Sequence, residues 1–121
     1  MKLRQYPGRD RKHVAVNTHT MSWEPLGGGR ERKVLYLQPG YQDTTRLERW
    51  PADWAPGELT YARGAELFVL EGSFEDEHGR YDAHTWMRLP MRFSHRPRTQ
   101  ERCELYVKEG GFAYLRGPTA S

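Results

Sequence analysis

The run Glu66-Leu67-Phe68-Val69-Leu70-Glu71-Gly72-Ser73-Phe74 is the most informative stretch of the sequence. Its aliphatic and aromatic residues predict a strand over residues 66–70, because such side chains suit a pleated, half-buried surface. The acidic residues and His78-Gly79 that follow are typical of an exposed hairpin tip over residues 75–80. Gly79 can adopt the positive φ that such a tip often requires, and we expect His78 to face solvent.

Short β-rich runs of this kind recur along the whole chain. They cover residues 13–16, 34–37, 44–50, 59–62, 66–70, 85–89, 103–107 and 112–115. Glycine and proline separate them, for example at Pro39-Gly40, Pro56-Gly57 and Gly110-Gly111. Because helical periodicity is almost absent, the pattern favours an antiparallel sandwich or jelly roll over βαβ units.

Length and composition indicate one globular domain. The chain has 121 residues, of which 36% are hydrophobic and 12% aromatic, and this is enough apolar side chain for a core. We expect residues 1–12 to form a loose N-terminal arm, residues 13–116 the domain and residues 117–121 a flexible tail. The net charge of +3 does not by itself indicate nucleic-acid binding.

Cysteine usage and hydropathy limit the location of the protein. Cys103 is the only cysteine, so an internal disulfide and a cysteine-based zinc site within one chain are both excluded. We expect Cys103 to be a buried small hydrophobe. No run approaches the roughly 18 apolar residues that cross a bilayer, and the N-terminal residues lack a signal-peptide pattern. We therefore expect a cytoplasmic protein with no membrane partner.

The chain from Glu66 onward resembles a known family. The resemblance continues through Leu89-Pro90, His95-Arg96-Pro97 and residues 103–108. These segments are similar to single-domain cupins related to the C-terminal domain of the anti-sigma factor ChrR, within the RmlC-like cupin superfamily. Small acetylacetone-cleaving dioxygenases have similar barrels. The resemblance implies an all-β fold, the cupin double-stranded β-helix or jelly-roll barrel, with a single domain and a central cavity.

The resemblance also implies where metal ligands would lie. The first cupin motif places His-x-His and a glutamate before a closing glycine, and the second motif supplies another histidine. With Gly72 as the closing glycine, the two histidine positions fall on Leu59 and Tyr61, and the glutamate position falls on Ala65. The histidine of the second motif is retained as His95. The metal-binding motif is therefore degenerate.

One histidine cannot hold a divalent ion well, because leucine and alanine donate no electron pair. A tyrosine with its usual pKa near 10 is neutral and a poor ligand. We therefore predict no cofactor. Binding of iron, zinc, manganese or nickel through altered ligands, such as Tyr61 and His95 with His84, remains an alternative.

The barrel could instead bind an organic molecule directly. Tyr61 offers a hydroxyl group and His95 an imidazole, and these two are the catalytic candidates if the protein is an enzyme. Arginines could meet a carboxylate and a tryptophan could stack on the ligand. The predicted cavity residues are Leu59, Tyr61, Ala65, His95, Arg49, Trp86 and Arg88.

Each polar candidate also has a structural interpretation. Arg49 and Arg88 could form surface ion pairs, Trp86 could belong to the core, and Tyr61 and His95 could hydrogen-bond to each other. The leading hypothesis is a protein that binds or senses a small molecule without redox chemistry. One alternative is a metal-dependent dioxygenase-like enzyme with altered ligands. Another is a structural or dimerisation module, because cupins often form homodimers through strand edges.

Overall fold

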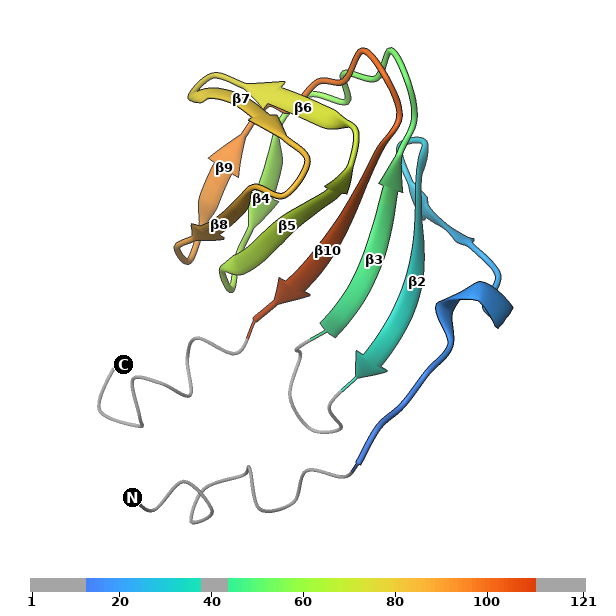
Figure 1. The fold of residues 1–121 in the computed structure, drawn as a ribbon. Helices are drawn as coiled ribbons and strands as arrows, with labels where there is room; N and C mark the ends of the chain where they lie inside the picture. The colour runs from blue at the N-terminus through green and yellow to red at the C-terminus, as the bar shows by residue number, and fades with distance from the viewer. Residues whose placement is uncertain (1–12, 38–43, 111–121) are drawn as a thin grey trace, which may run out of the picture.

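The computed structural model describes residues 13–37 and 44–110, and these residues form an almost entirely β structure (Figure 1). The elements are η3 (Thr18–Thr20), β1 (Glu24–Gly27), β2 (Arg30–Leu37), β3 (Thr44–Trp50), β4 (Leu59–Tyr61), β5 (Ala65–Glu71), β6 (Ser73–Asp76), β7 (Gly79–Asp82), β8 (Trp86–Leu89), β9 (Phe93–His95) and β10 (Cys103–Glu109). The predicted all-β, single-domain fold is confirmed.

The strands form one large antiparallel sheet and two small ones. The large sheet has the order β1-β2-β3-β10-β5-β8, so β10 lies between two strands that are distant from it in sequence. The small sheets are β4-β9 and the β6-β7 hairpin, and they gather on one side of the large sheet, next to β5 and β8 (Figure 1). Crossing connections of this kind produce a jelly roll.

The core lies between the sheets and follows the two-residue alternation of the strands. On β10, Cys103, Leu105 and Val107 are buried, whereas Glu104 and Tyr106 between them are only partly buried. The core includes an aromatic cluster around Trp50. Its ring centroid lies 4.9 Å from that of Trp54 and 5.0 Å from that of Phe74. This alternation decides which side chains can reach the interior.

Most of the predicted strands are present. The run 44–50 coincides with β3, and runs 34–37, 59–62, 66–70, 85–89 and 103–107 each overlap a strand. The hairpin predicted over residues 75–80 is β6-β7, with Gly79 at φ 153° and His78 exposed. The strand predicted over residues 13–16 is wrong, because these residues are exposed and pair with no strand.

Other predictions fall outside the described part of the chain. These are the arm over residues 1–12, the strand over residues 112–115 and the tail over residues 117–121. Among the described residues, no helix has the length and apolar character that a membrane crossing requires.

Gly72 lets two neighbouring strands approach each other closely. Its φ is +76°, a region that favours glycine, and a Cβ atom at this position would overlap the carbonyl oxygen of Arg102. Gly72 lies between β5 and β6, and Arg102 immediately precedes β10. A glycine is therefore required where the chain leaves the large sheet.

Candidate functional site

Tyr61 and His95 meet inside the barrel. They lie on the paired strands β4 and β9, in which Leu59 is opposite His95. The Tyr61 hydroxyl oxygen is 3.1 Å from His95 Nε2, and the exposed fractions of the two residues are 5% and 1%. Leu59 packs against the core cluster that contains Tyr61 and the fully buried Ala65. The structure thus brings Leu59, Tyr61 and His95 together and places Ala65 in the same core.

A buried carboxylate fixes the other side of the histidine ring. Asp76 Oδ2 lies 2.9 Å from His95 Nδ1, and both side chains are almost completely buried. Asp76 Oδ1 accepts hydrogen bonds from the backbone N–H of His78 at 2.8 Å and from the Tyr81 hydroxyl at 3.3 Å. Asp76 Oδ2 accepts from the Nδ1–H of His95, and Nε2, on the other side of the ring, contacts the Tyr61 hydroxyl.

Tyr61 is held as a neutral phenol. Burial raises the pKa of Tyr61 well above its ordinary value, and the negative charge of Glu48 raises it further. The phenol therefore keeps its proton at neutral pH. The result is a buried chain of two hydrogen bonds from Asp76 through His95 to Tyr61.

A second polar cluster points inward from the large sheet. Glu48 is 1% exposed, and its Oε1 accepts from Trp50 Nε1 at 2.8 Å and from Arg30 Nη1 at 3.3 Å. Its Oε2 accepts from Arg46 Nε at 2.7 Å, while Arg46 Nη2 bonds Glu109 Oε1 at 2.8 Å. Two arginines and two glutamates thus balance each other's charge within the barrel.

Asp76, Glu48 and Arg46 were not among the sequence candidates. Asp76 falls within the hairpin tip predicted to be exposed, but its position two residues after Phe74 places both side chains on the inner face. Arg46 and Glu48 share the face of Trp50 for the same reason. The alternation was visible in the sequence, but only the burial of Trp50 and Phe74 reveals which face is inside.

Arg49 belongs to the outer surface, so its predicted place in the cavity is wrong. Its neighbours Glu48 and Trp50 point inward, and Arg49 must therefore point outward. There its Nη2 lies 2.7 Å from Glu31 Oε1, and its guanidinium carbon lies 4.3 Å from the centroid of the Trp23 ring.

Trp86 and Arg88 also lie on the outer face rather than in the predicted cavity. Leu89 is buried, so the alternation turns Trp86 and Arg88 to the other face of β8. Trp86 is 53% exposed, and the Arg88 guanidinium carbon lies 5.3 Å from the centroid of its ring. Arg88 Nη2 is also 3.7 Å from Glu66 Oε2.

The residues at the cupin ligand positions do not fit a divalent metal ion. Leu59 and Ala65 have no donor atoms, Tyr61 is a neutral phenol, and both nitrogens of His95 are already hydrogen-bonded. His84 is exposed and its ring faces Phe68, so it does not complete the set. Across residues 13–37 and 44–110, no three histidine, cysteine or acidic side chains gather into a metal-binding group.

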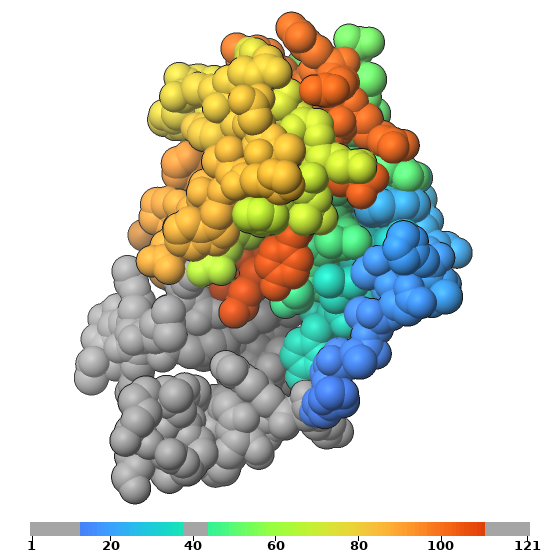
Figure 2. Space-filling view, viewed as in Figure 1, coloured from blue at the N-terminus to red at the C-terminus, as the bar shows by residue number. Residues whose placement is uncertain are grey.

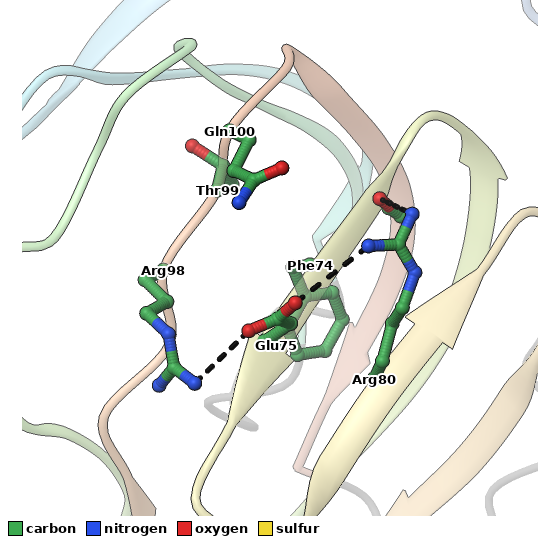
Figure 3. Close-up of a pocket in the computed structure, with 7 residues that line it drawn as sticks. Phe74, Glu75, Arg80, Arg98, Thr99 and Gln100 are labelled. Carbon is green, nitrogen blue, oxygen red and sulfur yellow. Dashed lines mark hydrogen bonds and ion pairs between the residues drawn. The ribbon is translucent and has the colours of Figure 1, made fainter.

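Neither the Cys103 thiol nor the surface pocket around Glu75 offers a reactive or unpaired charged group. Burial raises the pKa of the Cys103 thiol to about 12, which leaves it protonated and unreactive at neutral pH. A surface pocket beside β6 places Glu75 between two arginines (Figure 3). Glu75 lies 2.9 Å from Arg98 Nη2 and 3.6 Å from Arg80 Nη1, so its carboxylate already engages both cations of this pocket.

The crossing strand order defines a cupin-type jelly-roll barrel. Residues 11–113 match the family described as ChrR Cupin-like domain, and the chain belongs to this family. No curated protein matches the sequence.

Solved structures show the same fold. A putative acetylacetone dioxygenase from Methylibium petroleiphilum is 18% identical with a TM-score of 0.73, over 84% of this chain and 78% of that chain. The acetylacetone dioxygenase from Acinetobacter johnsonii is 17% identical with a TM-score of 0.67, over 84% and 74%. ChrR of Rhodobacter sphaeroides, solved in complex with SigE, is 23% identical with a TM-score of 0.63, over 88% of this chain and 54% of that chain.

Proposed function

We propose that this protein binds a small polar organic molecule inside the barrel, without a metal ion. The observation that carries the proposal is the buried chain from Asp76 through His95 to Tyr61. Tyr61 and His95 are the residues that the cupin motifs would assign to metal ligands. In this arrangement Tyr61 and His95 act as hydrogen-bonding groups, and Asp76 positions the imidazole ring.

Buried polar groups support binding over a purely structural barrel. Removing ionised and hydrogen-bonding side chains from water costs free energy, and apolar residues of similar size would fill the same space at lower cost. Here one barrel buries Asp76, His95, Glu48 and Arg46 together. Such groups, and strongly perturbed pKa values like that of Tyr61, concentrate at functional sites.

The polar groups suggest the chemistry of the ligand. Whichever of the two donates in the contact between Tyr61 and His95, the Tyr61 oxygen keeps a lone pair that can accept a hydrogen bond from a ligand hydroxyl. Arg63 follows in the turn between β4 and β5, and its buried Nε has no hydrogen-bond acceptor within the described part of the chain. A carboxylate would satisfy this donor. We therefore propose a small hydroxy acid as the preferred ligand class.

The names of the structural neighbours suggest other activities. Oxygen chemistry of the kind implied by the dioxygenase names requires a metal centre that the residues around His95 do not supply. Association with SigE is a property of ChrR, and the present chain matches only about half of the length of ChrR. We retain the cytoplasmic location in the proposal, because the only cysteine is a buried free thiol.

A thermal-shift screen with small carboxylic acids, hydroxy acids and ketones tests the proposal. Stabilisation should grow with ligand concentration as RT ln(1 + [L]/Kd). Tyr61→Phe should weaken the response roughly tenfold in Kd, because about 1.4 kcal/mol of hydrogen bonding is removed. Tyr36→Phe is the matched control, since Tyr36 lies on β2 outside the site and should respond as the wild type. An equal response in both variants would place binding elsewhere, and no response to any compound would support a structural barrel.

A further inference from the structure

Two arginines lie on neighbouring turns at one end of the barrel. Arg63 is in the turn between β4 and β5, and Arg92 is in the turn between β8 and β9. Both turns bond to the backbone carbonyl oxygen of Tyr61, which accepts from the N–H of Gly64 at 3.0 Å and from that of Arg92 at 2.8 Å. The strands β5 and β8, which border these turns, pair with each other and reach the surface side by side (Figure 2). The backbone of both arginines therefore lies next to Tyr61.

Neither of these two arginines has an anionic partner within the part of the chain that the structure describes. Two other arginines near this end of the barrel are paired, because Arg88 Nη2 lies 3.7 Å from Glu66 Oε2 and Arg46 Nη2 lies 2.8 Å from Glu109 Oε1. The buried Nε of Arg63 also lacks a hydrogen-bond acceptor among the described residues. Buried donors of this kind are rare in folded proteins, so the turn carries a donor that a ligand can satisfy.

The backbone of Arg92 is an independent indication of a role for its side chain. Its φ is +65°, in the left-handed region that favours glycine. A residue with a Cβ atom is destabilised in this conformation, so glycine would be the more stable residue at this position. Non-glycine residues with such backbone strain concentrate at binding and catalytic sites. The fold alone therefore does not explain an arginine in this turn.

We propose that Arg63 and Arg92 together bind the two carboxylates of a small hydroxy dicarboxylic acid. This inference rests on the proposed function, in which the Tyr61 oxygen accepts a hydrogen bond from the ligand hydroxyl, and it defines the ligand class more narrowly. A ligand with two negative charges balances two guanidinium groups, whereas a monocarboxylic acid leaves one of them without a counter-charge. Arg63 binds one carboxylate through its buried Nε, and Arg92 binds the other from the adjacent turn.

Isothermal titration calorimetry with three small acids tests the proposal. Malate has a hydroxyl group and two carboxylates, lactate has a hydroxyl group and one carboxylate, and succinate has two carboxylates and no hydroxyl group. We expect malate to bind about tenfold more tightly than either of the other acids. Arg92→Gln should weaken malate binding about tenfold and leave lactate binding unchanged, whereas Arg63→Gln should weaken both. Arg98→Gln is the matched control, because it removes the same charge from an exposed arginine that pairs with Glu75 beside β6.

Arg92→Gly separates the binding role of this residue from its effect on stability. Relief of the backbone strain should raise the Tm of the free protein by about 2–4 °C. The same variant should bind malate about tenfold more weakly, as Arg92→Gln does. A variant that is more stable and still binds malate as the wild type does would contradict the assignment of Arg92 to the ligand.

The three acids also distinguish failure of this inference from failure of the proposed function. Equal affinities for malate and lactate, or unchanged malate binding in Arg92→Gln, would overturn the inference and leave the proposed function in place. Equal affinities for malate and succinate, with no effect of Tyr61→Phe, would overturn the role of Tyr61 and leave the arginine pair in place. Absence of binding by all three acids would overturn both.

Discussion

Asp76→Asn should lower stability strongly while leaving the fold intact. The substitution replaces one carboxylate oxygen by an NH₂ group of the same size. In the wild type, Asp76 Oδ2 lies 2.9 Å from His95 Nδ1, and the side chains of the two residues are 2% and 0% exposed. Loss of a charge-assisted hydrogen bond in such a site costs about 1.5–3 kcal/mol. At about 4 °C per kcal/mol for a domain of this size, the expected fall in Tm is about 6–12 °C.

The same variant should change which ring nitrogen of His95 carries the proton. The new amide can keep contact with His95 only by donating to Nδ1, so the ring proton moves to Nε2. Nε2 would then donate to the Tyr61 oxygen. Nitrogen-15 NMR of the imidazole ring distinguishes the two tautomers. Asp82→Asn is the control, because the Asp82 side chain is 70% exposed and pairs with Arg80 at the surface. Equal stability of the two variants, or an Nε2-protonated neutral ring in the wild type, would refute the reasoning.

Three further predictions concern the barrel itself. Gly72→Ala should lower the free energy of unfolding in denaturant by more than about 3 kcal/mol, because backbone strain and overlap with the backbone of Arg102 add. Gly57→Ala, also at positive φ but in open space, should lower it by about 1–2 kcal/mol. Equal losses in the two variants would contradict the close approach at Gly72. Glu48→Gln should cost about 3–5 kcal/mol, because it removes the buried carboxylate that pairs with both Arg46 and Arg30. Glu31→Gln on the outer face should have little effect, and similar losses in the two variants would contradict the buried network. Burial raises the pKa of Cys103 from 9.0 to about 12, so between these pH values the folded state keeps a proton that the unfolded state loses. The free energy of unfolding should therefore fall as the pH rises through this window. Urea unfolding at a series of pH values should show a smaller fall for Cys103→Ala, and the same pH dependence in both proteins would contradict a buried thiol.

The sequence was sufficient to predict strands whose residues show a clear β pattern. Residues 44–50 and 103–107 alternate or concentrate apolar residues over a full strand, and glycine at position 79 marks the β6-β7 hairpin. The three-residue strand β9 was not predicted, because so short a segment is ordered by its partner β4. The run 13–16 has strand-like residues but no partner, and local preference alone did not make it a strand.

The site could be predicted only where motif spacing fixes it. Spacing identified the positions of Tyr61 and His95, and their alternative interpretation as a hydrogen-bonded pair agrees with the 3.1 Å separation. Asp76 was hidden in an acidic run typical of an exposed turn, and Arg49 was placed inside because the sequence does not reveal which face of β3 is buried. A shift of one residue exchanges the two faces of a strand, so charged residues are easily assigned to the wrong side.

The metal content of the purified protein tests most directly whether the cupin ligand set has been replaced. Wild type and His95→Ala, purified without chelator, are compared by elemental analysis for iron, zinc, manganese and nickel. We expect substoichiometric metal in both proteins, because His95 is engaged by Asp76 and Tyr61 and no other donor stands at the ligand positions. A stoichiometric metal ion in the wild type that disappears in His95→Ala would contradict a metal-free site.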